Sequence, residues 1–238
     1  MARVSIVEMI ALSDPGTEVL RDKVYFHLGE LIRGGHFSPG EKIGIRNLAK
    51  DFDLSPTPVR EALYRLISEG VLESEANRSA RIPLLTSDQI TELKEIRLHV
   101  ECFAAERAAQ NGTPDMAARL REITAKLKTV REAGDRRADL ALVYRFQLEL
   151  YAGCNMPNLI RIIASLWLKT GPYLNFLFPN YVEFVATQRG AWRERIAVGI
   201  ENRDYKAVSA EVHQDIDQSL SYISSVISAA AMLQHASR

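Results

Sequence analysis

Cysteine is scarce in this chain of 238 residues, and so are long apolar runs. The two cysteines, Cys102 and Cys154, lie far apart without the spacing of a metal site, which argues against a disulfide framework and favours a reducing cytoplasm. The apolar stretch at residues 6–12 contains Glu8 and stops before Asp14, so it is too short for a signal peptide or a membrane span. We therefore expect a cytoplasmic protein that does not enter a membrane.

An excess of positive charge is also missing. The chain has 30 basic and 30 acidic residues, and residues 17–85 alone carry ten of each. Bulk charge therefore gives no support for nucleic-acid binding, and any such role must depend on where individual arginines are placed. Apolar residues make up 47% and charged residues 25% of the chain, which is typical of a globular protein long enough for two domains.

Residues 45–81 have the pattern of two short helices joined by a tight turn and followed by a small β-hairpin. The first helix is expected to end near Phe52. Ser55 is a preferred N-cap residue, because its hydroxyl can accept one of the free N–H groups of the next helix. Pro56 fits the first helical position, where the missing N–H costs nothing, and Gly70 is well placed to end the helix. This pattern predicts a winged helix-turn-helix.

The second of these helices has an apolar back and a polar front. An arginine such as Arg60 offers a planar pair of donors to guanine, and Thr57 can contact a phosphate or a thymine methyl. Arg65 lies on the flank of the same helix, and Arg78 projects from the hairpin, where a wing meets the DNA backbone or the minor groove. Taken alone, an amphipathic helix with two arginines is more often only a solvated face.

Five motifs occur in order between residues 39 and 71: Pro39-Gly40, Arg46-x-Leu48-Ala49, Ser55-Pro56-Thr57-Pro58-Val59-Arg60-Glu61-Ala62-Leu63, Leu66, and Glu69-Gly70-Val71. They closely resemble the GntR family of bacterial transcription regulators, and the run TPVREAL is a specific signature of it. The resemblance implies contacts with operator DNA from Arg46, Ser55, Thr57 and Arg60. Pro56 stands where many relatives carry a base-reading arginine, so one specific contact is expected to be missing.

The chain divides into an arm at 1–16, the winged helix-turn-helix domain at 17–82, a linker at 83–86 and a helical domain at 87–232. The first helix is expected over about 17–34. After the linker the pattern is helical throughout, with short connections that favour an antiparallel bundle. The helices are expected over about 87–110, 113–133, 137–152, 158–178 with a break at Gly171-Pro172, 185–202 and 205–231.

This second half contains looser motifs, namely Glu95-Ile96-Arg97-x-x-x-Glu101, Phe146, Leu150-Tyr151, Met156-Pro157-x-Leu159, Leu166-Trp167-Leu168 and Gly171-Pro172-Tyr173. They resemble the FCD ligand-sensing domain of the FadR subfamily within GntR. The expected fold is therefore mainly α, with an N-terminal winged helix-turn-helix that has a small β-wing and a C-terminal all-α antiparallel bundle of the FCD type.

Many FCD domains hold a divalent metal with one Asp or Asn and three His. In our alignment the corresponding positions are Val143, Gln147, Arg193 and Asp215. Valine cannot coordinate a metal, and an arginine brings a permanent positive charge to the place of the cation. We expect no metal and no other cofactor. Only an error in the helix register would bring alternative ligands into the site, and these would be Tyr144, Asp139 and His213.

The same positions still predict a polar cavity inside the bundle. One hypothesis is that Arg97 or Arg193 holds the carboxylate of an effector by a bidentate contact, with Gln147 and Asp215 beside it. The alternative is purely structural, with Arg97 paired to Glu101 one turn on and Arg193 paired to Asp215. The small organic acids that FCD domains commonly sense favour the first hypothesis slightly.

These expectations together describe a transcription regulator that binds a palindromic double-stranded operator as a homodimer. A small carboxylate bound in the helical domain would modulate its affinity, and the regulator is expected to be a repressor. One alternative is a constitutive DNA-binding protein with a ligand-blind dimerisation bundle. A helical enzyme is a weaker alternative, because no nucleophile–base pair, phosphate loop or paired carboxylate motif is present.

Overall fold

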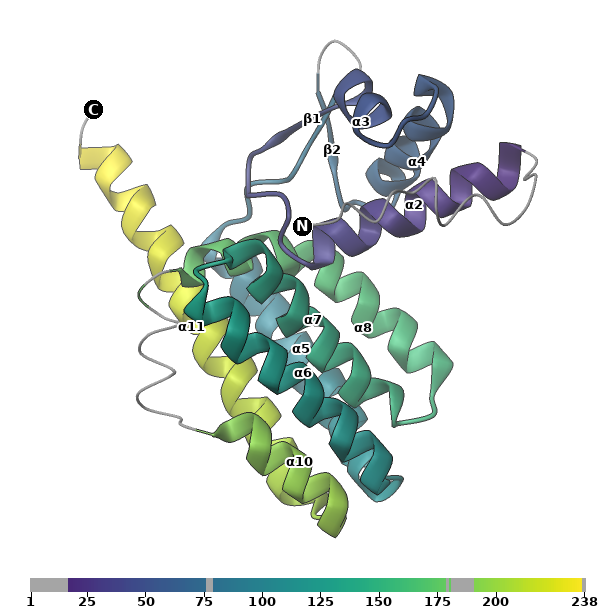
Figure 1. Ribbon diagram of the computed structural model, residues 1–238. Helices are drawn as coiled ribbons and strands as arrows, with labels where there is room; N and C mark the ends of the chain where they lie inside the picture. The colour runs from purple at the N-terminus through teal and green to yellow at the C-terminus, as the bar shows by residue number, and fades with distance from the viewer. Residues whose placement is uncertain (1–16, 76–78, 179, 181–190, 237–238) are drawn as a thin grey trace. The chain divides into compact units, whose positions relative to one another are not determined.

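The computed structural model describes residues 17–75, 79–178, 180 and 191–236 (Figure 1). The chain separates into two compact units, and the division at Leu84–Leu85 falls within the stretch expected to be a linker. Residues 33–36 group with the second unit. None of the described helices is long and apolar enough to cross a membrane. The expected arm at 1–16 and the tip of the wing, with Arg78, lie outside the described residues.

The N-terminal unit contains the expected winged helix-turn-helix. Its elements follow the order α2 (Thr17–Arg33), β1 (Lys42–Gly44), α3 (Ile45–Asp51), α4 (Pro56–Ser68), β2 (Glu73–Glu75) and β3 (Ser79–Arg81). The three strands form an antiparallel sheet in the order β1-β3-β2. Ala80 at the centre of β3 pairs with Ile43 on one side and Ser74 on the other.

Two tight turns fix α4 in this unit. Asp53 adopts a left-handed backbone (φ 54°) between α3 and α4, and the N–H of Leu54 bonds the carbonyl of Ala49 at 2.8 Å. Gly70 (φ 66°) ends α4 in the conformation that glycine adopts most readily. The apolar back of α4 packs inward, as its spacing predicts, through Val59, Ala62, Leu63 and Leu66.

The second unit is a bundle of helices. It comprises α5 (Ser87–Gln110), α6 (Pro114–Glu132), α7 (Arg136–Ala152), α8 (Pro157–Thr170), the 3₁₀ helix η1 (Gly171–Leu177), α10 (Trp192–Asn202) and α11 (Tyr205–Ala236). Figure 1 shows α5 in the middle of the bundle, packed mainly against the long α11. Thr86 and Gln89 form a reciprocal capping box at the start of α5.

All of these helices contribute buried side chains to one apolar core. The expected break at Gly171-Pro172 is confirmed, because α8 stops at Thr170 and the chain continues as η1 rather than as an α-helix. Proline at that point removes a backbone donor from the helix interior. The helix expected over 185–202 is described only from Trp192 onward.

Candidate nucleic-acid interface and ligand cavity

The N-terminus of α4 is unusual because two of its first three residues are prolines. Ser55 is the N-cap residue, as expected, but the predicted capping hydrogen bond is wrong, because its hydroxyl bonds no backbone N–H. The physical reason lies in Pro58, which occupies the third helical position and has no N–H to donate. Among these first three residues only Thr57 retains an N–H. The exposed hydroxyls of Ser55 and Thr57 are therefore the polar groups at this helix end.

A cleft of about 530 Å³ opens beside this helix end, between α3, α4 and β3. Arg46 from α3 and Arg60 from α4 both line the cleft, together with Asn47 and Ser79. The Nε atom of Arg60 is buried and finds no acceptor among the residues that the structure describes. Two arginines on one cleft, beside exposed hydroxyls, suit an anion such as a DNA phosphate or the acceptor edge of a base.

Arg65 is not brought to this cleft. It lies one and a half turns further along α4, where its guanidinium bonds Glu69 at 3.1 Å and Asp22 at 3.4 Å. The same guanidinium stacks over the ring of Tyr25 at 3.8 Å, and Tyr25 donates a hydrogen bond to Glu69. These contacts connect α4 to α2. The DNA contact of Arg65 stays a sequence prediction, and these contacts with α2, which cannot be read from α4 alone, favour a structural role instead.

The second unit contains a small cavity of about 60 Å³. Its ionisable lining consists of Arg97, Arg131, Asp139, Arg193 and Asp215. Three of the four sequence candidates thus meet: Arg97, Arg193 and Asp215 line the cavity, and Gln147 contacts it through Asp215. Sequence reasoning missed Arg131 altogether and considered Asp139 only as a metal ligand. The apolar lining comes from Leu140, Val143, Trp167, Leu174, Leu177, Phe178 and Trp192.

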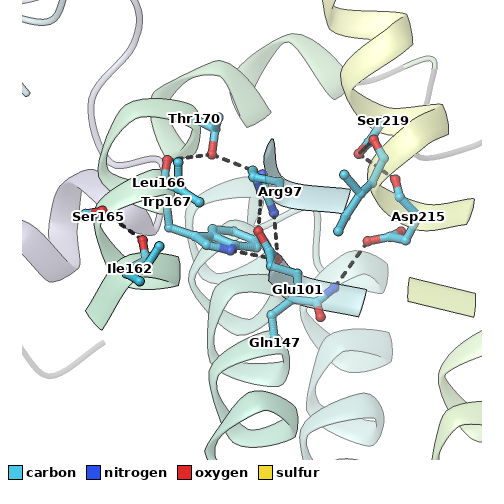
Figure 2. Close-up of polar contacts among 11 residues, drawn as sticks. Arg97, Glu101, Gln147, Ile162, Ser165, Leu166, Trp167, Thr170, Asp215 and Ser219 are labelled. Atoms are coloured by element: carbon cyan, nitrogen blue, oxygen red, sulfur yellow. Dashed lines mark hydrogen bonds and ion pairs between the residues drawn. The ribbon is translucent and has the colours of Figure 1, made fainter. Parts of the chain in front are cut away.

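Arg97 is the centre of a buried network in this unit (Figure 2). Its guanidinium binds both oxygens of Glu101, at 2.5 and 3.2 Å, and donates to the hydroxyl of Thr170 at 3.0 Å. It also stacks over the ring of Trp167 at 4.3 Å, and the indole N–H of Trp167 donates to Glu101 at 3.2 Å. The predicted structural pair between Arg97 and Glu101 is therefore confirmed.

The environment of Arg97 keeps it charged. Burial opposes the positive charge, but the carboxylate of Glu101 outweighs it and holds the pKa of Arg97 above its usual value. Tyr151 lies in the same buried region, where burial first and the Glu101 charge second raise its pKa well above the usual value. Every guanidinium nitrogen of Arg97 already serves a protein acceptor, so this residue is built into the bundle.

Asp215 and Gln147 form the other polar contact. Gln147 donates from Nε2 to Oδ2 of Asp215 at 3.2 Å, which Figure 2 shows as a bridge from α7 to α11. The hydroxyl of Ser219, one turn after Asp215 on α11, donates to the backbone carbonyl of Asp215 at 2.6 Å. The remaining oxygen of Gln147, Oε1, is buried without a donor among the described residues.

Arg193 and Arg131 are two positively charged residues in the lining of the cavity. The guanidinium of Arg193 lies over the rings of Trp192 at 4.2 Å and Phe146 at 5.4 Å. Arg131 binds both oxygens of Asp139, at 2.8 and 3.1 Å, and Asp139 is itself buried. Arg193 thus stacks on aromatic rings at the lining of the cavity, and Arg131 is paired with a carboxylate.

The donor set does not fit the metal that many FCD domains carry. Val143 and Arg193 offer no ligand atom to a cation, and Asp139 is engaged by Arg131. His213 lies on the exposed face of α11. No group of three His, Cys, Asp or Glu side chains able to hold a metal occurs among the described residues.

Comparison with known families matches both units. Residues 20–82 match the model of bacterial regulatory proteins of the gntR family, and residues 92–218, more than half of the chain, match the FCD domain. The chain belongs to the GntR family, in the branch that carries an FCD domain. The family resemblance drawn from the TPVREAL run and the helical motifs is therefore confirmed.

Individual relatives agree with this assignment. The chain is 35% identical over 144 residues to the HTH-type transcriptional regulator McbR of Escherichia coli (strain K12), covering 60% of this chain and 65% of the relative. It is 39% identical over 87 residues to the Nta operon transcriptional regulator of Aminobacter aminovorans, covering 37% and 41%. The match therefore spans less than two thirds of either curated relative. Both are named as transcriptional regulators, which disfavours the helical-enzyme alternative.

Solved structures share the fold. The structure of E. coli McbR/YncC superposes with a TM-score of 0.73 at 28% identity, over 86% of this chain and 96% of that chain. A regulator of the GntR type from Rhodococcus sp. RHA1 superposes with a TM-score of 0.65 over 85% and 96%. At 20% identity the second likeness supports the fold alone.

Proposed function

We propose that this GntR-family protein is a DNA-binding transcriptional regulator that acts in the cytoplasm. Its affinity for an operator changes when a small molecule binds its FCD domain. The observation that carries the proposal is the cleft beside α4, where Arg46 and Arg60 line one space next to the exposed hydroxyls of Ser55 and Thr57. As in its relatives, we expect the outcome to be regulation of transcription, and here repression.

Side chains, rather than the backbone of α4, carry the phosphate contacts in this proposal. A helix N-terminus usually offers several N–H groups to a phosphate, but Pro56 and Pro58 remove two of them here. Arg46, Ser55 and Thr57 take over this positioning role. Arg60, on the lining of the cleft, reads a base edge in the major groove. Arg78 on the wing tip remains a candidate for the minor groove or the backbone.

The proposed operator is palindromic because the protein binds as a homodimer. Two copies of α4 related by a two-fold axis meet two half-sites in successive major grooves, and the symmetry of the DNA sequence then reflects the symmetry of the protein. An effector that favours one arrangement of the two N-terminal domains changes how well both helices reach their half-sites.

The effector site is the cavity between the helices of the FCD domain. Because every guanidinium nitrogen of Arg97 already bonds a protein acceptor, we assign the contact with an effector carboxylate to Arg193, with Asp215 and Gln147 shaping the opposite side. Arg97 holds the wall of the cavity in place. Effector binding in this proposal requires no metal or other cofactor, because Arg193 supplies the positive charge.

The decisive experiment for DNA binding starts from selection of operator fragments from the genome that encodes the protein. The selected DNA is then titrated with the wild type, Arg60→Ala and Arg65→Ala. We expect Arg60→Ala to reduce specific affinity by about 10–100-fold, with the fold and dimer intact. Arg65→Ala is the matched control, because it removes the same side chain from the same helix outside the cleft. Unchanged affinity in Arg60→Ala would refute the assignment.

A constitutive regulator with a ligand-blind bundle is the remaining alternative. A repeat of the titration with small molecules that bind the C-terminal unit separates the two: a sensor changes its operator affinity, whereas a ligand-blind protein does not. DNA binding itself is tested independently by the Arg60 variant.

A further inference from the structure

One face of the wing sheet continues the cleft beside α4. Cross-strand partners in an antiparallel sheet share a face, and so do residues two apart along a strand. Gly44 of β1 and Ser79 of β3 are partners, and both line the cleft. Lys42 and Arg81 are the other pair of partners on this face, and the residues between these pairs are buried. Under the proposed function, Lys42 and Arg81 therefore lie on the side of the sheet that meets DNA.

A carboxylate on the same face binds both of these basic residues. Glu75 of β2 is the partner of Ser79 in the sheet register, so its side chain projects from the face that lines the cleft. Its Oε2 forms an ion pair with Nζ of Lys42 at 3.2 Å, and its Oε1 forms another with the guanidinium of Arg81. The two oxygens of one carboxylate thus serve two cations that belong to two different strands.

Phosphates of DNA require the same cations. A lysine or arginine that neutralises a phosphate releases condensed counterions, and this sequence-independent term dominates non-specific binding. A cation that is paired with Glu75 has to exchange the carboxylate for the phosphate, and the carboxylate itself repels the phosphate. Ion pairs that are accessible to solvent are weak enough for such an exchange, so the two anions compete for Lys42 and Arg81.

From these observations we infer that Glu75 is a competitor, built into the wing, of DNA phosphates for Lys42 and Arg81. It restrains the part of DNA binding that carries no sequence information, and it leaves recognition to the residues of the cleft. The inference rests on the proposed DNA binding and names a residue that tunes it. If Glu75 served only to hold the three strands together, its removal would weaken DNA binding, whereas a competitor predicts the opposite.

The test measures non-specific binding as a function of salt. A double-stranded DNA of random sequence is titrated with the full-length wild type and with Glu75→Gln between about 50 and 200 mM salt, the range over which phosphate contacts are lost. We expect Glu75→Gln to bind more tightly than the wild type at the low-salt end. Each added phosphate contact steepens the slope of log K against log salt by about 0.9, so two released cations add up to about 1.8. Over this range the variant should lose about tenfold more affinity than the wild type.

Glu122→Gln is the matched control. It makes the same change in charge, and it also releases a lysine, Lys126, from an exposed ion pair, but in the FCD domain. The control should keep the wild-type affinity and the wild-type slope. An equal effect of Glu122→Gln and Glu75→Gln would assign the change to net charge and overturn the inference.

Substitution of the two cations tests the competition itself. Lys42→Gln and Arg81→Gln together should alter the slope of the wild type little, because Glu75 already occupies both residues. In the Glu75→Gln background the same two substitutions should return the slope to the wild-type value. A loss of about 1.8 from the slope in the wild-type background would show that both cations contact phosphates in spite of Glu75, and would overturn the inference.

Thermal melting establishes that each variant is folded. Lys42→Gln alone, at a mostly exposed side chain, makes the same comparison with an expected slope change of about 0.9 if the substitution of Arg81 unfolds the unit. An unchanged slope in folded Glu75→Gln would overturn the inference, while the operator titration with Arg60→Ala still decides specific DNA binding. A wild type that binds neither random DNA nor selected operator fragments would overturn both.

Discussion

Arg97 and Glu101, one turn apart on α5, form a doubly bonded ion pair in which both side chains are almost completely buried. Thr170 and Trp167 complete the hydrogen bonds of this pair from α8. A charge pair in such a place is neutralised by the protein itself. Arg97 and Trp167 both line the cavity of this domain, so the pair supports the cavity wall.

Breaking the pair should destabilise the FCD domain strongly. We expect Glu101→Gln to lower the free energy of unfolding by about 3–5 kcal/mol, because it leaves the buried Arg97 charge without its partner. Urea denaturation followed by tryptophan fluorescence measures this, since Trp167 and Trp192, the only tryptophans of the chain, both lie in this domain. The control is Glu122→Gln, which removes an exposed i,i+4 partner of Lys126 and should change nothing measurable.

Arg65 should contribute to stability rather than to operator binding. Arg65→Ala removes the contacts with Asp22, Glu69 and Tyr25, and we expect the N-terminal unit to lose about 1 kcal/mol or less, since the pairs are exposed. Hydrogen exchange of the amides in α2 and α4 reports this loss. A drop in operator affinity comparable to that of Arg60→Ala would show that Arg65 contacts DNA after all.

The N-terminal unit should lose stability in mild acid through His27. Burial lowers the pKa of His27, and the charge of Glu30 offsets this only in part. The unfolded chain therefore binds the proton more readily than the folded chain. The contribution of neutral His27 to the free energy of unfolding is complete above about pH 6.5, and it is lost as the pH falls through the lower, folded-state pKa. His27→Gln should flatten this dependence in hydrogen exchange between pH 7.5 and 5. An unaltered slope would contradict the role of His27, which packs its ring edge-on against Phe52.

Divalent metals should leave the protein unchanged. Val143 and Arg193 are assigned from the sequence to two metal-ligand positions of FCD domains, and neither side chain can coordinate a cation. Chelator-treated protein melted with Zn²⁺, Ni²⁺ or Mn²⁺ is therefore expected to show the melting temperature of the metal-free sample. A clear rise with any of them would mean that residues outside this alignment, such as Asp139, form a site.

The winged helix-turn-helix was predictable because its signals are local. The apolar spacing of α4, the proline at its first position and the glycine after its end are all read within one short stretch. The same holds for the start of α5 and for the break at Gly171-Pro172. The missing capping bond of Ser55 was also local in origin, because Pro58 alone removes the donor.

The ligand cavity was only partly predictable, because its residues come from helices far apart in sequence. The structure brings Arg193 and Asp215 to one cavity, with Gln147 bonded to Asp215, and their role in binding an effector stays a prediction. Arg131 could not be assigned from the sequence, because its pairing with Asp139 depends on how α6 packs against α7. The hydrogen bond from the Ser219 hydroxyl to the backbone carbonyl of Asp215 likewise depends on the geometry of α11 and cannot be predicted from the residue type alone.

The measurement that tests the central claim most directly is operator affinity as a function of a small molecule that binds the FCD cavity, in the wild type and in Arg193→Gln. We predict that the ligand changes the affinity of the wild type by about 5–150-fold, the usual range for coupling between two sites, and leaves that of Arg193→Gln unchanged. A wild-type affinity that stays constant at ligand concentrations saturating the cavity would contradict the account and leave a constitutive DNA-binding protein.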